Sequence, residues 1–294
     1  MLGYPARAAA RMREALALAH SIGHPFSLAH AQAFAAAFHV SRREPEAVQA
    51  QADAAVALSI EHGFGAVLKG GRYHQGWVRA EQGEEDGLGP MREWAAICQD
   101  TRTAILIPPY LAWLAEAYAK LGHPAEGLAL VRDALAAATD SGYPFWTAEL
   151  HRLKGALTLQ AGSVEGSGKS RTHHGRSVRT TPRAAAPGSA AEENAESCFL
   201  EALALARRQR AKLFELRAAT SVSRLWGRQG RARDAQALLS EVYGWFVEGF
   251  DTADLTEAKA LLEELDSGAS ARPQVGSKRA SRASPIRPLR GGKA

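Results

Sequence analysis

The stretch PAEGLALVRDALAAATDSG, residues 124–142, shows how this chain is built. Its apolar positions recur at spacings of three and four residues, which places them on one face of a helix. These positions are Leu128, Val131, Leu135 and Ala138. Pro124 lies at the predicted start, where its missing N–H has no helical partner to lose, and Gly142 follows the predicted end, where a left-handed residue is favoured. The stretch therefore predicts one amphipathic helix with both ends marked.

Similar stretches recur along the chain. Residues 13–23, 53–63, 92–102, 132–142 and 200–210 resemble one another, and their starts are 40, 39, 40 and 68 residues apart. A second marker, a glycine after a predicted helix, recurs at Gly83, Gly122, Gly162 and Gly230 with steps of 39, 40 and 68 residues. Because both series contain the same long step, about 28 extra residues enter one repeat after Gly162.

A period of about 40 residues accommodates two helices and their short connections. Ala, Leu, Glu and Arg dominate the chain outside a few segments, and these residues favour helices. Since one helical hairpin cannot bury its apolar face alone, hairpins of this kind stack. We therefore expect an all-α, right-handed α-solenoid of TPR-like hairpins with about eleven helices. A HEAT-like solenoid is the alternative, because the tetratricopeptide period is about 34 residues.

Glycine and proline mark the predicted helix ends. The glycines expected just past helix ends are Gly23, Gly63, Gly122, Gly142, Gly162 and Gly230. The prolines expected at or near helix starts are Pro5, Pro25, Pro45, Pro124 and Pro144.

Two segments differ in composition from the rest. Residues 163–190 are rich in Gly, Ser and Pro and hold five Lys/Arg against one acid, and residues 267–294 hold seven Lys/Arg and no acid. Such segments bury too little apolar surface to offset the entropy of ordering them. We therefore expect TPR-like repeats over 1–162 and 191–266, a disordered basic insert over 163–190, and a disordered basic tail over 267–294.

The insert contains Gly168-Lys169-Ser170, which matches the end of a phosphate-binding loop. The full pattern needs a glycine five residues before Gly168, where this chain has Ser163. It also needs a strand before the loop and a helix after it, whereas a predicted helix precedes this segment. We therefore expect no nucleotide site here.

The sequence indicates no other catalytic, metal or cofactor site. His173 and His174 have no third ligand nearby, and the remaining histidines follow no ligand spacing. Cys98 and Cys198 are the only cysteines, which is typical of a reducing cytoplasm. The chain has no run of about 18 apolar residues and no apolar signal-peptide core at its start, so we expect no membrane association.

Aromatic side chains offer a candidate partner-binding surface. The first helices of successive hairpins line the concave face of such a solenoid, and rings there could grip a peptide. The candidates are Tyr73, Trp77, Tyr110, Trp113, Trp146 and Trp226. Core packing is the alternative for each ring.

The last predicted helix, about 254–265, is expected to cap the array. Asp254 is its expected N-cap, with Glu257 completing a capping pair. The apolar stripe of this helix is Leu255, Ala258, Leu261, Leu262 and Leu265, and its expected mates are Leu239, Val242 and Phe246.

Three stretches together resemble a known family: FWTAELHRLKGALTLQAG (145–162), AESCFLEALALARRQRAKLFELRAATSVSRLWGRQGR (195–231) and YGWFVEGFDTADLTEAKALLEEL (243–265). They are similar to the C-terminal tetratricopeptide-type region of bacterial class III adenylate/guanylate cyclase–ATPase fusion proteins, which are signalling ATPases of the STAND type. The resemblance implies a regulatory array that senses a partner or effector. This sequence lacks the family's cyclase and ATPase domains, its insert is longer and more basic, and its tail is extra.

We therefore expect a non-catalytic protein-interaction module that needs no cofactor and acts in the cytoplasm. Its protein partner is unidentified and could be a cyclase or ATPase domain. One alternative is a part of an enzyme whose cyclase or NTPase activity lies outside this chain. Another is nucleic-acid binding through the basic segments; the tail lacks the interleaved aromatic residues of such surfaces, so we do not expect it.

Overall fold

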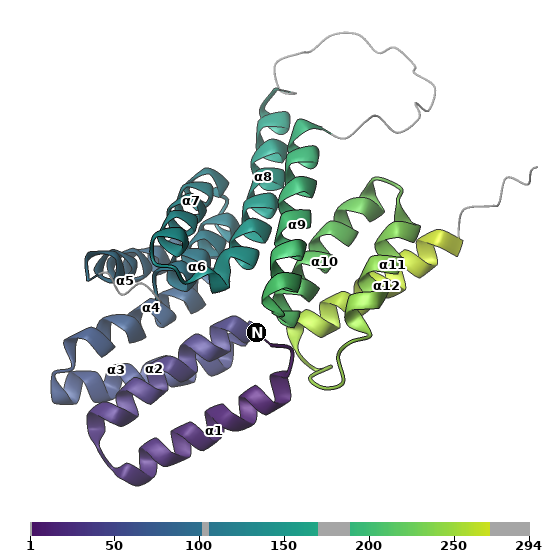
Figure 1. Ribbon diagram of the computed structural model, residues 1–294. Helices are drawn as coiled ribbons and strands as arrows, with labels where there is room; N and C mark the ends of the chain where they lie inside the picture. The colour runs from purple at the N-terminus through teal and green to yellow at the C-terminus, as the bar shows by residue number, and fades with distance from the viewer. Residues whose placement is uncertain (1, 102–105, 170–188, 271–294) are drawn as a thin grey trace, which may run out of the picture.

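The computed structural model describes residues 2–101, 106–169 and 189–270, and this part of the chain is all-α (Figure 1). It contains twelve α-helices, one more than predicted, and no strand. The helices are α1 (Pro5–Ile22), α2 (Pro25–Arg42), α3 (Pro45–His62), α4 (Gly65–Glu81), α5 (Leu88–Asp100), α6 (Ile107–Lys120), α7 (Pro124–Asp140), α8 (Thr147–Lys169), α9 (Ala190–Gln209), α10 (Lys212–Arg228), α11 (Ala232–Tyr243) and α12 (Ala253–Ser270). Short 3₁₀ turns, η1 (Glu85–Gly87) and η2 (Pro144–Trp146), precede α5 and α8.

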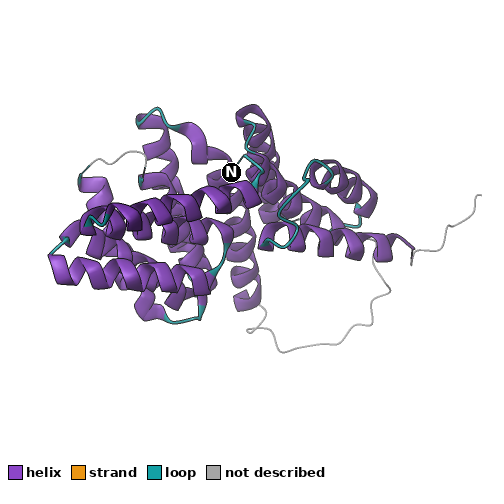
Figure 2. Cartoon of the chain, turned by 90° about the horizontal axis from the view of Figure 1, so that it is seen from below, coloured by secondary structure: helices purple, strands orange, loops and turns teal. Residues whose placement is uncertain are grey.

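The helices form a solenoid of two rows. Each helix packs against the next one along the chain, as the hairpin prediction requires. The even-numbered helices α2, α4, α6, α8, α10 and α12 also pack against one another in order, so they form an inner row, with the odd-numbered helices outside (Figure 1). Figure 2 shows the described part from below, with every element a helix or a loop. Two main apolar clusters fill the space between the rows, one from α2 to α8 and one from α9 to α12.

The predicted glycine and proline markers lie at helix ends with one exception. Gly23, Gly63, Gly122, Gly142 and Gly230 all have positive φ angles just past a helix. The prediction for Gly162 is wrong, because α8 continues past it to Lys169. A Cβ on Gly162 would lie 2.8 Å from the Cβ of Ala191 on α9, so this glycine permits close approach of two helices.

The boundaries of the two basic segments also need correction. The sequence predicts a disordered insert that includes residues 163–169, but these residues extend α8 by almost two turns. It also places residues 267–270 in the disordered tail, but they belong to α12. The rest of the predicted insert and tail, residues 170–188 and 271–294, lies outside the described residues.

The last helix caps the array as predicted, but it begins differently. Leu255, Ala258, Leu261 and Leu265 are buried together with Leu239, Val242 and Phe246, and Leu262 is partly buried against them. Asp254 is not the N-cap: it lies in the first turn of α12, and its carboxylate binds Arg217 instead. Glu257 likewise binds arginines from other helices rather than the start of its own.

The two ends of the solenoid meet. The N–H of Arg7 donates to the Glu248 carboxylate at 3.1 Å, and the rings of Tyr4 and Trp245 lie 5.4 Å apart. Arg43, directly after α2, binds Glu257 of α12 at 2.7 Å. We call these interactions between residues 4–43 and residues 245–257 the closure contact; Figure 1 shows the two ends of the solenoid side by side. They bring the inner helices of the first and last repeats together around a common space.

In the described part of the chain, no helix combines the length and the apolar character needed to cross a membrane.

Candidate functional site: a charged central cavity

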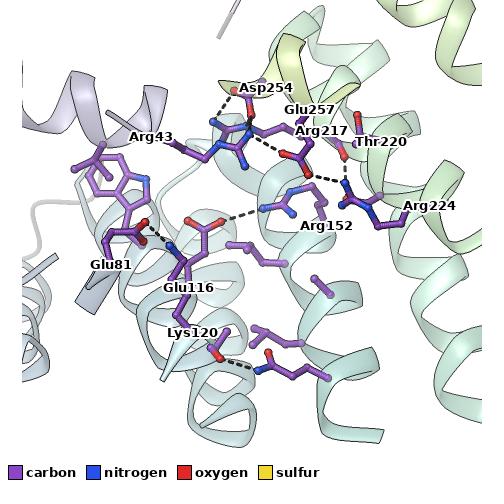
Figure 3. A pocket seen from close by; sticks show the side chains of 18 of the residues that line it. Arg43, Glu81, Glu116, Lys120, Arg152, Arg217, Thr220, Arg224, Asp254 and Glu257 are labelled. Atoms are coloured by element: carbon purple, nitrogen blue, oxygen red, sulfur yellow. Dashed lines mark hydrogen bonds and ion pairs between the residues drawn. The ribbon is translucent and has the colours of Figure 1, made fainter. Parts of the chain in front are cut away.

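A cavity of about 300 Å³ lies where the inner helices converge (Figure 3). All six inner helices, or the residues directly after them, contribute to its wall. Each helix presents residues spaced three or four apart, such as Trp113, Glu116 and Lys120 on α6. The cavity therefore forms only when every repeat is in place and the two ends of the solenoid meet.

One part of the wall is apolar. It is formed by Val40, Trp77, Trp113, Leu153, Ala156 and Leu157. Trp113 is held from behind by an edge-to-face contact with Trp146, with ring centroids 5.6 Å apart. This wall presents an apolar surface to the cavity.

The other part of the wall is a network of ion pairs centred on Arg217. Its guanidinium donates two hydrogen bonds to the Asp254 carboxylate, at 3.0 and 2.9 Å, and a third to Glu149 at 3.2 Å. It also donates to the carbonyl oxygen of Ser41 at 2.7 Å. This one side chain therefore links α8, α10, α12 and the end of α2.

Arg152 extends the network toward α6. It donates to both oxygens of Glu149, at 2.9 and 2.8 Å, and to the Glu116 carboxylate at 3.0 Å. The Glu149 side chain is only 2% exposed, so its charge is neutralised by Arg152 and Arg217 rather than by water.

Arg43 and Arg224 lie at the outer end of the network. Both bind Glu257, at 2.7 and 2.8 Å, and Arg43 also lies 3.0 Å from Asp254. Elsewhere on the wall, Lys120 pairs with Glu81.

The network shifts the pKa values of its acids in opposite directions. Burial acts to raise the pKa of Glu149, but Arg152 and Arg217 outweigh it and lower this pKa to about 2. Burial acts to raise the pKa of Glu116, and the negative charge of Glu149 acts in the same direction. Together they outweigh the lowering effect of Arg152, so the pKa of Glu116 lies above its usual value. The network thus combines a firmly ionised carboxylate, buried behind the cavity wall, with a carboxylate on the wall that protonates more readily.

The six aromatic candidates do not form one binding surface. The rings of Tyr73, Trp77, Tyr110 and Trp113 are buried in the core that joins α2 to α8, which favours the core-packing alternative. The hydroxyl of Tyr73 donates to the carbonyl oxygen of Tyr110 at 2.7 Å. Only Trp77 and Trp113 reach the central cavity.

The remaining two candidates are half-buried elsewhere. Trp146 packs between Trp113 and Phe214. Trp226 donates from its indole to Glu196 at 2.7 Å, and the guanidinium of Arg231 lies over its ring. Neither lines the central cavity.

Sequence reasoning missed the charged residues of the cavity. Glu149 and Arg152 on α8, and Arg217 on α10, stand on the inward faces of their helices. The one sequence feature that could have indicated their burial is that they lie next to apolar residues such as Leu150 and Leu216, which are buried. Charged residues are rarely buried unless they are paired.

Two other motifs are also placed by the structure. Gly168 and Lys169 lie in the last turn of α8, where helical backbone replaces the open loop that a phosphate would need. Within the described ranges, no group of three or more His, Cys, Asp or Glu residues could hold a metal ion. His173 and His174 lie outside those ranges.

A comparison with protein-family models found no match, and a comparison with curated protein sequences found none either.

Proposed function

We propose that this chain is a non-catalytic protein-interaction module that holds a segment of its partner in the central cavity. One observation carries the proposal: all six inner helices contribute to one cavity, which joins an apolar wall to a charged one. Binding sites in proteins combine an apolar surface with a few polar groups that fix orientation.

The partner we propose is a domain of a cyclase–ATPase signalling system in the cytoplasm. The support is the resemblance of residues 145–162, 195–231 and 243–265 to the repeat region of such proteins. The module would sense its partner or effector by contacts that span all of its repeats, because a ligand in the cavity touches the first and the last hairpin together.

A pair of matched photo-crosslinking variants tests this function. A diazirine side chain at Ser221 faces the cavity, whereas the same side chain at Ser240 of α11 is exposed on the outer row. In cells that naturally express the protein, illumination should link the Ser221 variant, and not the Ser240 variant, to one discrete protein identified by mass spectrometry. Equal labelling at both positions, or no adduct at Ser221, would argue against a partner in the cavity.

A further inference from the structure

Two arginines at the end of the cavity network share one carboxylate. One oxygen of Glu257 accepts from Nη2 of Arg43 at 2.7 Å, and the other accepts from Nη2 of Arg224 at 2.8 Å (Figure 3). The three residues come from the end of α2, from α10 and from α12. Paired arginines arranged in this way are a common means of binding a carboxylate or phosphate group.

These two arginines have donors to spare. Each guanidinium carries five N–H groups, and the described residues give Arg224 a single ion-pair partner, Glu257. The side chains of Arg43 and Arg224 are 42% and 48% exposed, whereas those of Arg152 and Arg217 are 15% and 11% exposed. The unused donors of the first pair are therefore open to solvent and to a ligand.

The local charge also favours an anion. Asp254 gives both oxygens to the buried Arg217 and meets Arg43 only through one of them. Glu257 is thus the main counter-charge for two guanidinium groups. Partial burial acts to raise the pKa of Glu257, but the hydrogen bonds from Arg224 and Arg43 lower it, so the shared carboxylate stays ionised.

We propose that Arg43 and Arg224 form an anion site that Glu257 occupies internally, and that a partner carboxylate beside an apolar side chain takes its place. The apolar side chain would lie against Trp77 and Trp113, which line the same cavity. Acidic side chains and chain ends of an extended peptide have this chemistry. The identity of the partner as a protein rests on the proposed function, whereas the anion site itself does not.

Glu257 competes with any ligand for this site. It is tethered to α12, so its effective concentration is in the millimolar range or above. At 35% exposure its side chain has room to turn away when an anion arrives. Glu257→Gln keeps the shape but removes the competing charge, so this variant should bind anions more tightly than the natural chain.

N-acetyl-leucine is a suitable probe, because it carries one carboxylate and one apolar side chain. Its amide lacks the charge, and inorganic phosphate lacks the apolar group. Binding is followed by NMR through the indole N–H signals of Trp77 and Trp113. We expect Glu257→Gln to bind N-acetyl-leucine at least tenfold more tightly than the natural chain, phosphate less tightly than N-acetyl-leucine, and the amide not at all.

Two further variants keep the result specific. Replacing Arg224 by Gln in the Glu257→Gln chain should abolish the gain, with melting by circular dichroism showing that the fold persists. Glu241→Gln is the matched control, since it makes the same change in net charge at an exposed ion pair with Arg207. No saturable binding to Glu257→Gln, or an equal gain in Glu241→Gln, would overturn the anion site.

Two outcomes separate the parts of the inference. If phosphate binds as tightly as N-acetyl-leucine, the assignment of a carboxylate with an apolar neighbour is wrong. If N-acetyl-leucine binds as expected but the Ser221 crosslinker captures nothing, the anion site stands and the protein-interaction function fails.

Discussion

Replacing Arg217 by Met should weaken the whole molecule, because this arginine holds four elements together. Met has a similar length and no charge, so the change removes four hydrogen bonds and leaves two buried carboxylates, Glu149 and Asp254, with one partner fewer. Those carboxylates are 2% and 5% exposed, so water cannot replace the guanidinium.

The size of the effect follows from this burial. Removing one member of a buried ion pair costs about 3–5 kcal/mol of unfolding free energy. A chain of this length loses roughly 2–4 °C of melting temperature per kcal/mol, so the midpoint should fall by roughly 6–20 °C. Hydrogen exchange should accelerate most at residues 41–44 and 252–257, because Arg217 joins α10 to α12 and to the carbonyl oxygen of Ser41.

Urea unfolding followed by circular dichroism measures the change. Arg132→Met is the matched control: Arg132 is 78% exposed on α7, and its ion pair with Asp133 is 3.8 Å long. That variant should stay within about 0.5 kcal/mol of the natural chain. If Arg217→Met is as stable as Arg132→Met, Arg217 does not hold the cavity together.

Three further perturbations have defined outcomes. The folded-state pKa of Glu149 is about 2, which lies below the unfolded value, so ionised Glu149 contributes about 3 kcal/mol of stability above about pH 5. This contribution is lost as the pH falls toward 2. Urea titrations of Glu149→Gln should therefore show a smaller loss of unfolding free energy at acid pH than those of the natural chain. Gly76→Ala should lower the unfolding free energy by about 1–3 kcal/mol, since the added Cβ would lie 2.4 Å from the carbonyl oxygen of Gly87. Gly89→Ala is the control, because a Cβ there meets nothing within 4 Å, and thermal melting should show a lower midpoint for the first variant only. Truncation before α12 should cause aggregation on size-exclusion chromatography by exposing the apolar face of α11, while truncation after α12 should leave a monodisperse chain as heat-stable as the original.

The helices could be predicted because their signals are local. Spacings of three and four residues, a proline at the start and a glycine at the end act within one or two turns, so residues 124–142 define α7 without reference to the rest. The glycine marker failed at Gly162 because Ala191, on the neighbouring helix, requires a residue without a side chain there. A close approach between helices leaves no local pattern.

The cavity could not be predicted because it depends on residues far apart in the chain. Asp254 looks like an N-cap in its local sequence, yet the guanidinium of Arg217, 37 positions away, decides its role. The contact between Arg7 and Glu248 depends on the small rotation of each repeat relative to the one before it, added over the whole solenoid. No short stretch of sequence predicts the total rotation. The aromatic candidates follow from residue type and an expected place on the concave face. Of the four rings that are buried, only those of Trp77 and Trp113 line the cavity.

The closure contact is tested most directly by crosslinking the two ends of the solenoid. Cysteines replace Arg7, whose side chain is 71% exposed, and its partner Glu248 in a chain where Cys98 and Cys198 are changed to Ala. A short bis-maleimide added to the native protein should link residues 241 positions apart within one chain, in high yield, and so give a faster-migrating band in denaturing gels. The single Arg7→Cys variant should give no such band. If the double variant also fails to form an internal link while remaining folded by circular dichroism, the ends do not meet and the cavity does not close.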